Sequence, residues 1–337
     1  MLLSGKKTAV WVMLGLLLVL TACGSKSIKE QETTATSAPV QQTEVSAEDK
    51  QDTEQENSEA QTRVVQDEFG DVEIPANPKR VAAIYLEDYL TVLNVEPIVQ
   101  WYHPWWGKQD YLNLDVPLFD MTGSIESLLE AKPDIIIVDG SVDAAKYEIY
   151  SKVAPTYRLK EEILLDPEAI LSTIADVLGI PDQATTAMEH YNQVMNDTKQ
   201  KLQAAVGNET VAVLRLEVGD NSLIMFSEDN RYIGNIYHQM GLTAAPLAKS
   251  MEAFNELLSE EVLPELEADH IFILTSDGGW DTEDNKDAIS WMENSLWKNV
   301  PALKNGQVYY VDRTHWQSGA IKANLMKAED LLKYLVK

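Results

Sequence analysis

Apolar and polar residues divide the chain into three regions of different character. Residues 8–20 form an apolar run of about 13 residues behind two lysines, which suits a signal peptide and is too short to span a bilayer as a helix. Residues 24–61 carry hardly any large apolar side chain, so they bury too little surface to fold. We therefore expect a leader at 1–22, a disordered acidic tether at 23–62 and a folded region after it.

Short apolar runs alternate with helical patterns in the folded region. Ile135–Val138 and Ile271–Leu274 each read as a buried strand that follows a helix-like segment. Such alternation indicates an α/β fold with mostly parallel sheets.

Capping residues or a helical period of apolar residues mark three helices clearly. One begins at Asp166 as N-cap with Pro167 in the first turn, and ends at Gly179. A longer helix is predicted over 182–206, in the middle of the folded region, and an amphipathic helix over 321–335 closes the chain.

An internal repeat suggests two related lobes on either side of the long helix. Ser124, Glu126 and Asp134, before the first strand, have the same spacing as Ser259, Glu261 and Asp269, before the second. Each Ser is a candidate N-cap, which would place each Glu in a first turn, where the helix dipole favours it. The expected organisation is an N-terminal lobe at 63–181, a bridging helix at 182–206 and a C-terminal lobe at 207–337.

Composition then excludes several function classes. The 337 residues carry 54 acidic against 27 basic side chains, a formal charge of −27, and no local basic stripe, so nucleic acid is not an expected partner. A single cysteine forms neither an internal disulfide nor a multi-thiolate metal site. The chain lacks a Gly-x-Ser-x-Gly elbow, a phosphate loop and a Gly-x-Gly-x-x-Gly turn after a strand, so an enzyme is not expected.

That cysteine directly follows the apolar run, in the sequence Leu20-Thr21-Ala22-Cys23. These four residues resemble a bacterial lipobox, which implies cleavage before Cys23 and acylation of its thiol and its new amino group. Two or three acyl chains anchor a protein stably to a membrane. The alternative is a buried free cysteine beside an uncleaved anchor.

Several motifs together resemble one family, the substrate-binding lipoproteins of iron-siderophore ABC importers. They are the lipobox and tether, Gly70–Pro75, Pro78–Val81, Gly123–Glu126, Lys132–Val138, Val153–Thr156, and Gly306–Tyr309 followed by Trp316 and Gly319. The resemblance covers about residues 63 to 337. One departure is Asn94, where the family often has Gly.

The resemblance implies both a fold and a way of working. The fold would be two Rossmann-like α/β lobes bridged by one rigid helix, with the ligand in the cleft between them and limited hinge motion. One surface glutamate of each lobe would dock on arginines of the membrane permease, and Glu126 and Glu261 match these positions. The receptor would act as a monomer without a cofactor, anchored on the outer face of the membrane. A tether of nearly 40 residues suits a Gram-positive surface.

A loop rich in aromatic residues is the candidate ligand wall in the first lobe. It follows a strand expected at 97–99 and shows neither a helical nor an alternating period. The candidate contacts are Trp101, Tyr102, His103, Trp105 and Trp106. The alternative is a hydrophobic plug beneath a loop.

In the second lobe, Arg215 ends a predicted strand. In hydroxamate-binding relatives a similarly placed arginine contacts the metal-coordinating oxygens, so the resemblance assigns that role to Arg215; the alternative is a surface charge beside Glu217. Further wall candidates are Trp280 and Trp316, followed by Arg231 and Tyr232.

The histidines and the net charge narrow the range of expected ligands. His103 and His315 stand beside tryptophans in opposed lobes, where they would hydrogen-bond a siderophore or ligate the metal of haem or cobalamin. No His, Asp and Glu set has the spacing of a direct metal site. Four bases fall in expected loops: Lys108, Arg215, Arg231 and Arg313. A neutral or weakly charged ferric hydroxamate therefore fits an acidic receptor better than a highly anionic complex.

Overall fold

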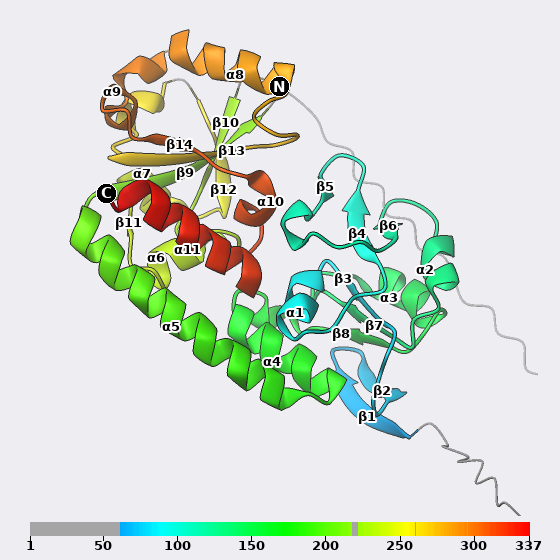
Figure 1. Cartoon of the computed structure of the whole chain (residues 1–337). Coiled ribbons are helices and arrows are strands. Elements are labelled where there is room, and N and C mark those ends of the chain that lie inside the picture. Colours follow the sequence, from blue (N-terminus) through cyan, green and yellow to red (C-terminus); the bar gives the residue numbers. More distant parts are fainter. Residues whose placement is uncertain (1–60, 218–221, 260, 295) are drawn as a thin grey trace, which may run out of the picture. The chain divides into compact units, whose positions relative to one another are not determined.

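The computed structural model describes residues 61–217, 222–259, 261–294 and 296–337 (Figure 1). The predicted leader, the predicted acylation site Cys23 and almost all of the predicted tether lie outside these residues. Among the described residues, none of the helices combines the length and the apolar character needed to cross a membrane.

The N-terminal lobe contains three small sheets. Strands β3, β7 and β8 pair in parallel with β7 in the middle, β4 pairs in parallel with β6 and antiparallel with β5, and β1 and β2 form an antiparallel hairpin. The strands are β1 (Thr62–Asp67), β2 (Gly70–Pro75), β3 (Val81–Ile84), β4 (Gln100–His103), β5 (Gly107–Lys108), β6 (Leu118–Asp120), β7 (Ile135–Val138) and β8 (Thr156–Arg158). The helices are α1 (Glu87–Val92), η1 (Asp110–Leu112), α2 (Glu126–Ala131), α3 (Ala144–Ser151), η2 (Glu161–Ile163) and α4 (Pro167–Leu178).

The C-terminal lobe has one mixed sheet in the order β12-β10-β9-β13-β14, with β11 beside β9. Its strands are β9 (Thr210–Glu217), β10 (Ser222–Phe226), β11 (Thr243–Ala244), β12 (Asn255–Leu258), β13 (His270–Thr275) and β14 (Val308–Tyr310). Its helices are α6 (Gly234–His238), α7 (Pro246–Ser250), η3 (Leu263–Glu265), α8 (Glu283–Asn294), η4 (Leu296–Asn299), α9 (Pro301–Lys304), α10 (Arg313–Trp316) and α11 (Ile321–Leu335).

The strands predicted from apolar runs form the centre of each lobe. Every residue of β3, β7 and β13 is buried, as expected for parallel strands covered on both faces. Helix α4 begins and ends as predicted, because the Asp166 carboxylate accepts bonds from two amide groups of the first turn and Gly179 adopts a left-handed conformation with φ of 73°. Asn94 is also left-handed, with φ of 56°, which explains why glycine suits that position.

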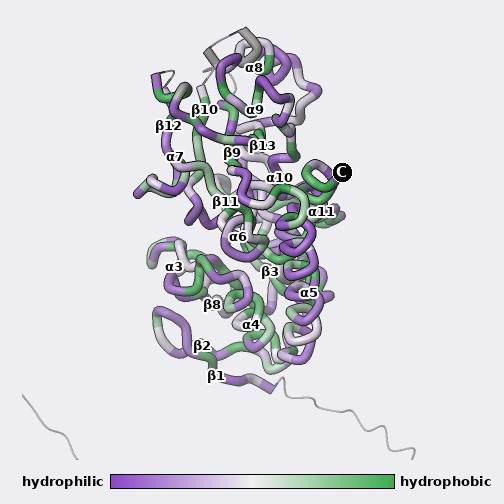
Figure 2. Tube along the Cα trace, turned by 90° about the vertical axis from the view of Figure 1, so that its left-hand side faces the viewer, coloured by the Kyte–Doolittle hydropathy of each residue, from purple (hydrophilic) through white to green (hydrophobic). Residues whose placement is uncertain are grey.

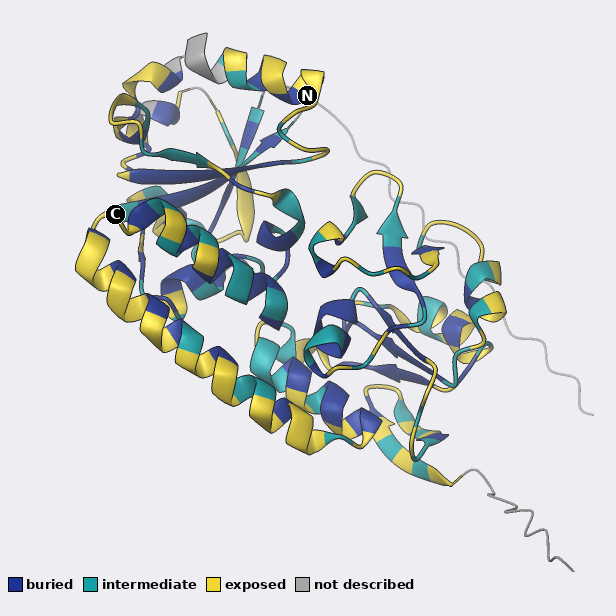
Figure 3. Cartoon of the chain, in the orientation of Figure 1, coloured by how far each residue is buried: buried dark blue, intermediate teal, exposed yellow. Residues whose placement is uncertain are grey.

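Helix α5 (Pro181–Val206) has 26 residues, so it is about 39 Å long. It packs against α4 of the N-terminal lobe and against α11 of the C-terminal lobe. Hydrophilic and hydrophobic positions alternate along it in Figure 2, and Figure 3 shows its exposed residues gathered along one side. The expected fold of two α/β lobes with mostly parallel sheets, bridged by one long helix, is confirmed.

The repeated Ser-Glu motifs differ in local structure. The N-cap of α2 is Ile125, and the Ser124 hydroxyl accepts a bond of 3.4 Å from the Glu126 amide. In the second copy Glu261 lies in a turn that leads into the three-residue η3. The prediction that each Ser caps an α-helix is therefore wrong, because a local cap pattern does not decide whether a helix propagates. Both glutamates are exposed.

A carboxylate of the N-terminal lobe caps a helix of the C-terminal lobe. The Asp88 side chain accepts bonds from the amide groups of Lys322 and Ala323 at 2.9 and 3.0 Å, and from the Tyr111 hydroxyl at 2.7 Å. The N-cap residue of α11, Ala320, supplies no side-chain bond of its own. Because Asp88 is 1% exposed, it ties the start of α11 to α1 without help from water.

We expect the replacement Asp88→Ala to lower the free energy of unfolding by about 3 kcal/mol, because it leaves buried donors on both lobes without an acceptor. Urea denaturation of the purified protein measures this change. The exposed carboxylate of Glu130 provides a matched control, and Glu130→Ala is expected to change stability by about 0.5 kcal/mol or less. Equal effects of the two replacements would contradict the role of Asp88.

Candidate ligand-binding site

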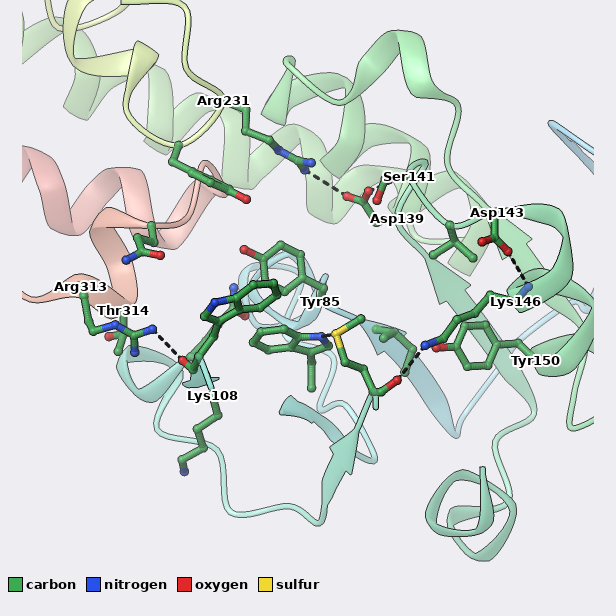
Figure 4. Close-up of a pocket in the computed structure, with 18 of the residues that line it drawn as sticks. Tyr85, Lys108, Asp139, Ser141, Asp143, Lys146, Tyr150, Arg231, Arg313 and Thr314 are labelled. Atoms are coloured by element: carbon green, nitrogen blue, oxygen red, sulfur yellow. Dashed lines mark hydrogen bonds and ion pairs between the residues drawn. The ribbon is translucent and has the colours of Figure 1, made fainter. Parts of the chain in front are cut away.

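Both lobes line one cavity of about 470 Å³, a volume typical of small-molecule sites. The N-terminal lobe contributes residues from the ends of β3, β4 and β7, from the β5 region and from α3, and the C-terminal lobe contributes residues from β9, from the turn before α6 and from α10. Figure 4 shows side chains from these segments pointing toward one another. The cavity is thus a cleft between the lobes, as expected.

Aromatic side chains form one wall of the cavity. The rings of Tyr85 and Trp101 pack edge to face with their centroids 4.8 Å apart. The Trp101 indole nitrogen lies 3.0 Å from the Met121 sulfur. Trp106 also lines the cavity and stacks on His103 at 4.1 Å. These rings offer a planar, apolar surface to a ligand.

The polypeptide holds this wall in place from behind. The Trp101 amide donates a 2.5 Å bond to the buried Glu87 carboxyl group, which lies on α1. Tyr85 follows β3 with φ of 64°, a conformation that is costly for a bulky residue and that clusters at functional sites. The position of this tyrosine is therefore imposed by the surrounding fold.

Five cationic and two acidic side chains line the cavity. The cations are Lys108, Lys146, Arg215, Arg231 and Arg313, and the acids are Asp139 and Asp143. The cavity is consequently cationic, although the protein as a whole is strongly acidic.

Two of the arginines are held by carboxylates of the protein. Arg215 donates from Nε to Glu217 at 2.6 Å, and Arg231 donates to Asp139 at 3.0 Å. The second pair joins the lobes and is visible in Figure 4. Such pairs neutralise part of the positive charge that the cavity offers to a ligand.

Arg313 is held differently. Its Nη2 donates to the Trp106 carbonyl of the other lobe at 2.7 Å, while its Nε is buried without a hydrogen-bond partner among the described residues. Burial lowers the pKa of this guanidinium, and several acidic residues nearby oppose that shift. The guanidinium suits an anionic oxygen in the cavity, since its planar fork of N–H donors matches carboxylate and related oxygens.

The structure brings together only part of the predicted site. Trp101, Trp106 and Arg215 line the cavity, as do Arg231 and Tyr232. Lys108 and Arg313, which the sequence placed in loops, line it as well.

Three residues of the aromatic loop are not among the lining residues: Tyr102, His103 and Trp105. His103 backs Trp106, and Trp105 is 78% exposed. They belong to the same β4–β5 hairpin as the wall, and the strand expected at 97–99 lies at 100–103 instead, so the predicted aromatic loop is in part strand β4.

Two of the predicted wall residues in the second lobe pack elsewhere. Trp316 is completely buried, stacks on Phe272 at 5.0 Å and donates to Asp330, so it is a core residue. The Trp280 indole donates to the Val311 carbonyl, and this residue is not among the cavity lining. Complete burial excludes Trp316 from the wall, because an aromatic residue packs into its own lobe when that buries more apolar surface. Trp280 is half-buried, and its indole is held by its own lobe rather than by the cavity.

The histidine pair that would favour haem or cobalamin does not face the cavity. His315 is buried and hydrogen-bonds to Asp330 at 2.8 Å, and neither it nor His103 is among the lining residues. Within the described part of the chain, no group of three or more His, Cys, Asp and Glu residues is arranged to hold a metal ion.

Several lining residues were not predicted from the sequence, most importantly Tyr85, Asp139, Lys146 and Gln317. A signal for two of them was present, since Tyr85 directly follows strand β3 and Asp139 directly follows β7. Ligands of α/β proteins bind beyond the carboxyl ends of parallel strands. Lys146 lies on α3 and bonds to the Met121 carbonyl, and nothing in the sequence marks this helix as facing the cleft.

Comparisons with known proteins agree with this architecture. Residues 95–314 match the family model described as periplasmic binding protein. The Fe(3+)-citrate-binding protein YfmC of Bacillus subtilis is 30% identical over 291 residues, which cover 81% of this chain and 85% of that protein. The iron(3+)-hydroxamate-binding protein FhuD of the same organism is 30% identical over 266 residues, covering 75% and 80%.

A solved structure has the same fold. It is a FhuD fold-family protein of Bacillus subtilis, described as the periplasmic binding protein component of a Fep/Fec-like ferrichrome ABC transporter. It superposes with a TM-score of 0.68 and 26% identity, over 81% of this chain and all of that chain. The relatives and structural neighbours are binding proteins, so the expectation of a binding protein rather than an enzyme is confirmed.

The carboxyl group behind the aromatic wall predicts a pH-dependent stability. Burial raises the pKa of Glu87 from 4.5 to about 8. Between pH 5 and 7 the folded protein therefore keeps a proton that the unfolded chain has released, so the free energy of unfolding falls by about 1.4 kcal/mol per pH unit. Glu87→Gln removes this contribution. Between pH 5 and 7, the free energy of unfolding of the variant is therefore expected to fall by roughly 2 to 3 kcal/mol less than that of the wild type.

Denaturant unfolding at pH 5, 6 and 7 measures the difference between wild type and Glu87→Gln. The exposed carboxyl group of Glu96 gives the control, since Glu96→Gln is expected to keep the wild-type pH profile. Parallel profiles for wild type and Glu87→Gln would show that Glu87 is ionised in the folded protein.

Proposed function

Because this chain belongs to the periplasmic binding protein family, we propose that it is the receptor of an ABC importer and captures a ferric siderophore or a related iron(III) chelate. The observation that carries the proposal is the cavity between the lobes, which combines an aromatic wall with a cationic lining. Iron is the cargo of the receptor, held by its chelator. Relatives of similar identity are named for ferric citrate and for ferric hydroxamate, so kinship leaves the chelator class open.

The charges in the cavity favour a chelator that presents anionic oxygens. The sequence favoured a neutral or weakly charged hydroxamate because few bases were expected at the cleft. All four of those bases line the cavity, and Lys146 adds a fifth. The negative charge of the protein as a whole is therefore no argument against an anionic ligand, since short-range attraction in a desolvated cleft outweighs screened repulsion from the distant surface. The hydroxamate class remains the competing prediction.

Arg313 is the best candidate for the main anion contact. It lines the cavity and forms no ion pair with a carboxylate among the described residues, whereas Arg215 is already bonded to a carboxylate at 2.6 Å. The role assigned to Arg215 by resemblance is therefore better placed at Arg313. Trp101 and Trp106 would cover the apolar part of the chelator, and their indole fluorescence would report binding.

Tryptophan-fluorescence titration tests the ligand class. We expect a ferric citrate or ferric catecholate complex to bind more tightly than a neutral ferric trihydroxamate. Arg313→Gln is expected to weaken binding of the anionic complex by about 10- to 100-fold, through loss of charge-assisted hydrogen bonds. Arg215→Gln, the matched control, is expected to have a smaller effect because Glu217 already engages this arginine.

Tightest binding of the trihydroxamate would restore the prediction made from the sequence. Tightest binding of haem or cobalamin, or no binding of any ferric complex, would overturn the proposed function.

Delivery to the permease forms the second part of the proposal. Acylated Cys23 would anchor the receptor to the outer face of the membrane, most simply in a Gram-positive cell. Glu126 and Glu261, one in each lobe and both exposed, would dock on arginines of the permease. Their exposure supports this role because a docking carboxylate has to remain accessible.

Uptake of radiolabelled ferric chelate tests delivery in cells whose only copy of the receptor is the variant. Cys23→Ala is expected to lose fatty-acid labelling, leave the membrane fraction and abolish uptake. The double variant Glu126→Arg, Glu261→Arg is expected to stay at the membrane, keep its ligand affinity and lose uptake about tenfold or more.

Glu130→Arg makes the same type of replacement at one other exposed position of α2 and is expected to preserve uptake. Normal uptake by the double variant would remove the glutamates from the docking site. Unchanged labelling of Cys23→Ala would refute the anchor.

A further inference from the structure

One cationic side chain in the cavity is already paired with an acidic side chain of the protein. The Asp139 carboxylate follows β7 directly, and its Oδ2 accepts a 3.0 Å bond from Nη2 of Arg231 in the opposite lobe. Its other oxygen accepts a 2.9 Å bond from the Ser141 amide. The Asp139 side chain is 7% exposed and that of Arg231 is 29% exposed. A carboxylate of the protein thus stands where an anionic ligand would bind Arg231.

The loop that carries Asp139 is held rigidly. The buried Arg158 side chain donates to the Val142 carbonyl at 2.7 Å and to the Gly140 carbonyl. A Cβ atom at residue 140 would lie 2.7 Å from the Leu159 carbonyl oxygen, so the close approach of these two backbones requires glycine. Because the loop is fixed from behind, Asp139 does not move aside easily when an anion enters.

This ion pair also differs from the other pairs around the cavity. Glu217 neutralises Arg215 from the same strand. Asp110 lies on the turn after Lys108, and its Oδ1 is 3.6 Å from the Lys108 Nζ. The Asp139–Arg231 pair, in contrast, joins the two lobes across the cavity itself. A ligand that uses Arg231 must therefore replace a bond that the protein makes to itself.

Building on the proposed function, we propose that Asp139 is a specificity-determining residue that competes with the ligand for Arg231. A singly charged anion gains one contact to Arg231 and meets the repulsion of Asp139, so it gains little. A chelate with several anionic oxygens also reaches Arg313 and the other bases, so its combined contacts exceed the loss. Asp139 thereby weakens the binding of small anions such as phosphate and acetate more than it weakens the binding of the larger ferric complex.

Asp139→Asn tests this role. Asparagine retains an oxygen for the Ser141 amide and removes the negative charge. We expect the variant to bind ferric citrate about tenfold more tightly, to gain more affinity than this for inorganic phosphate and acetate, and to bind a neutral ferric trihydroxamate within about twofold of wild type. Fluorescence titration measures the ferric complexes, and calorimetry measures the small anions.

Two further variants separate competition for Arg231 from a general change in charge. Asp143 also lines the cavity, and its carboxylate caps α3 without an arginine partner among the described residues. Asp143→Asn preserves the cap, because asparagine is an equally good N-cap, and is expected to raise affinity for ferric citrate much less. In an Arg231→Gln background, Asp139→Asn is expected to lose most of its effect, as a double-mutant cycle on a coupled pair requires.

Unchanged or weaker binding of ferric citrate by Asp139→Asn would overturn the inference. Equal gains from Asp139→Asn and Asp143→Asn, or a gain that persists in the Arg231→Gln background, would overturn it too. If wild type binds no ferric complex but Asp139→Asn still gains phosphate affinity through Arg231, the proposed function fails and the competition for Arg231 stands.

Discussion

The buried carboxylate of Asp88 is the contact on which the arrangement of the two lobes depends. The first amide groups of any helix need acceptors, and those of α11 find theirs on α1, in the other lobe. Formation of this helix start and docking of the lobes are therefore the same event. Further along α11, the buried amine of Lys327 donates to the carbonyls of Tyr232 and Ser318, next to residues that line the cavity. One helix thus contacts both the other lobe and the segments that line the cavity.

Electrostatics work on two length scales in this protein. The protein carries a net charge of −27, and its surface includes exposed carboxylates such as Glu126 and Glu261. The cavity is cationic, and its bases are partly neutralised by residues of the protein itself. Net charge therefore says little about the ligand, because a desolvated group interacts with its neighbours far more strongly than with screened charges at a distance.

The sequence located the segments of the site better than its side chains. The aromatic hairpin and Arg215 were found from composition, strand position and resemblance, and each does line the cavity or belongs to its wall. Trp316 was misplaced, since nothing local distinguishes an indole that stacks on Phe272 from one that faces a cleft. Lys146 was missed for the same reason. Which side of a helix faces a cleft depends on packing between elements that are distant in the sequence.

By itself, the sequence determined the strands β7 and β13, the caps of α4, the long helix α5 and a fold of two α/β lobes. These features follow from periodicity and from residues within a few positions of one another. Only the tertiary structure decided that Asp88 caps α11, that Asp139 holds Arg231 and that the Arg313 Nε is buried without a partner among the described residues. Asp88 and Ala323 are 235 residues apart, and Asp139 and Arg231 are 92 apart. Such partners become neighbours only after both lobes fold and dock, so no local pattern encodes them.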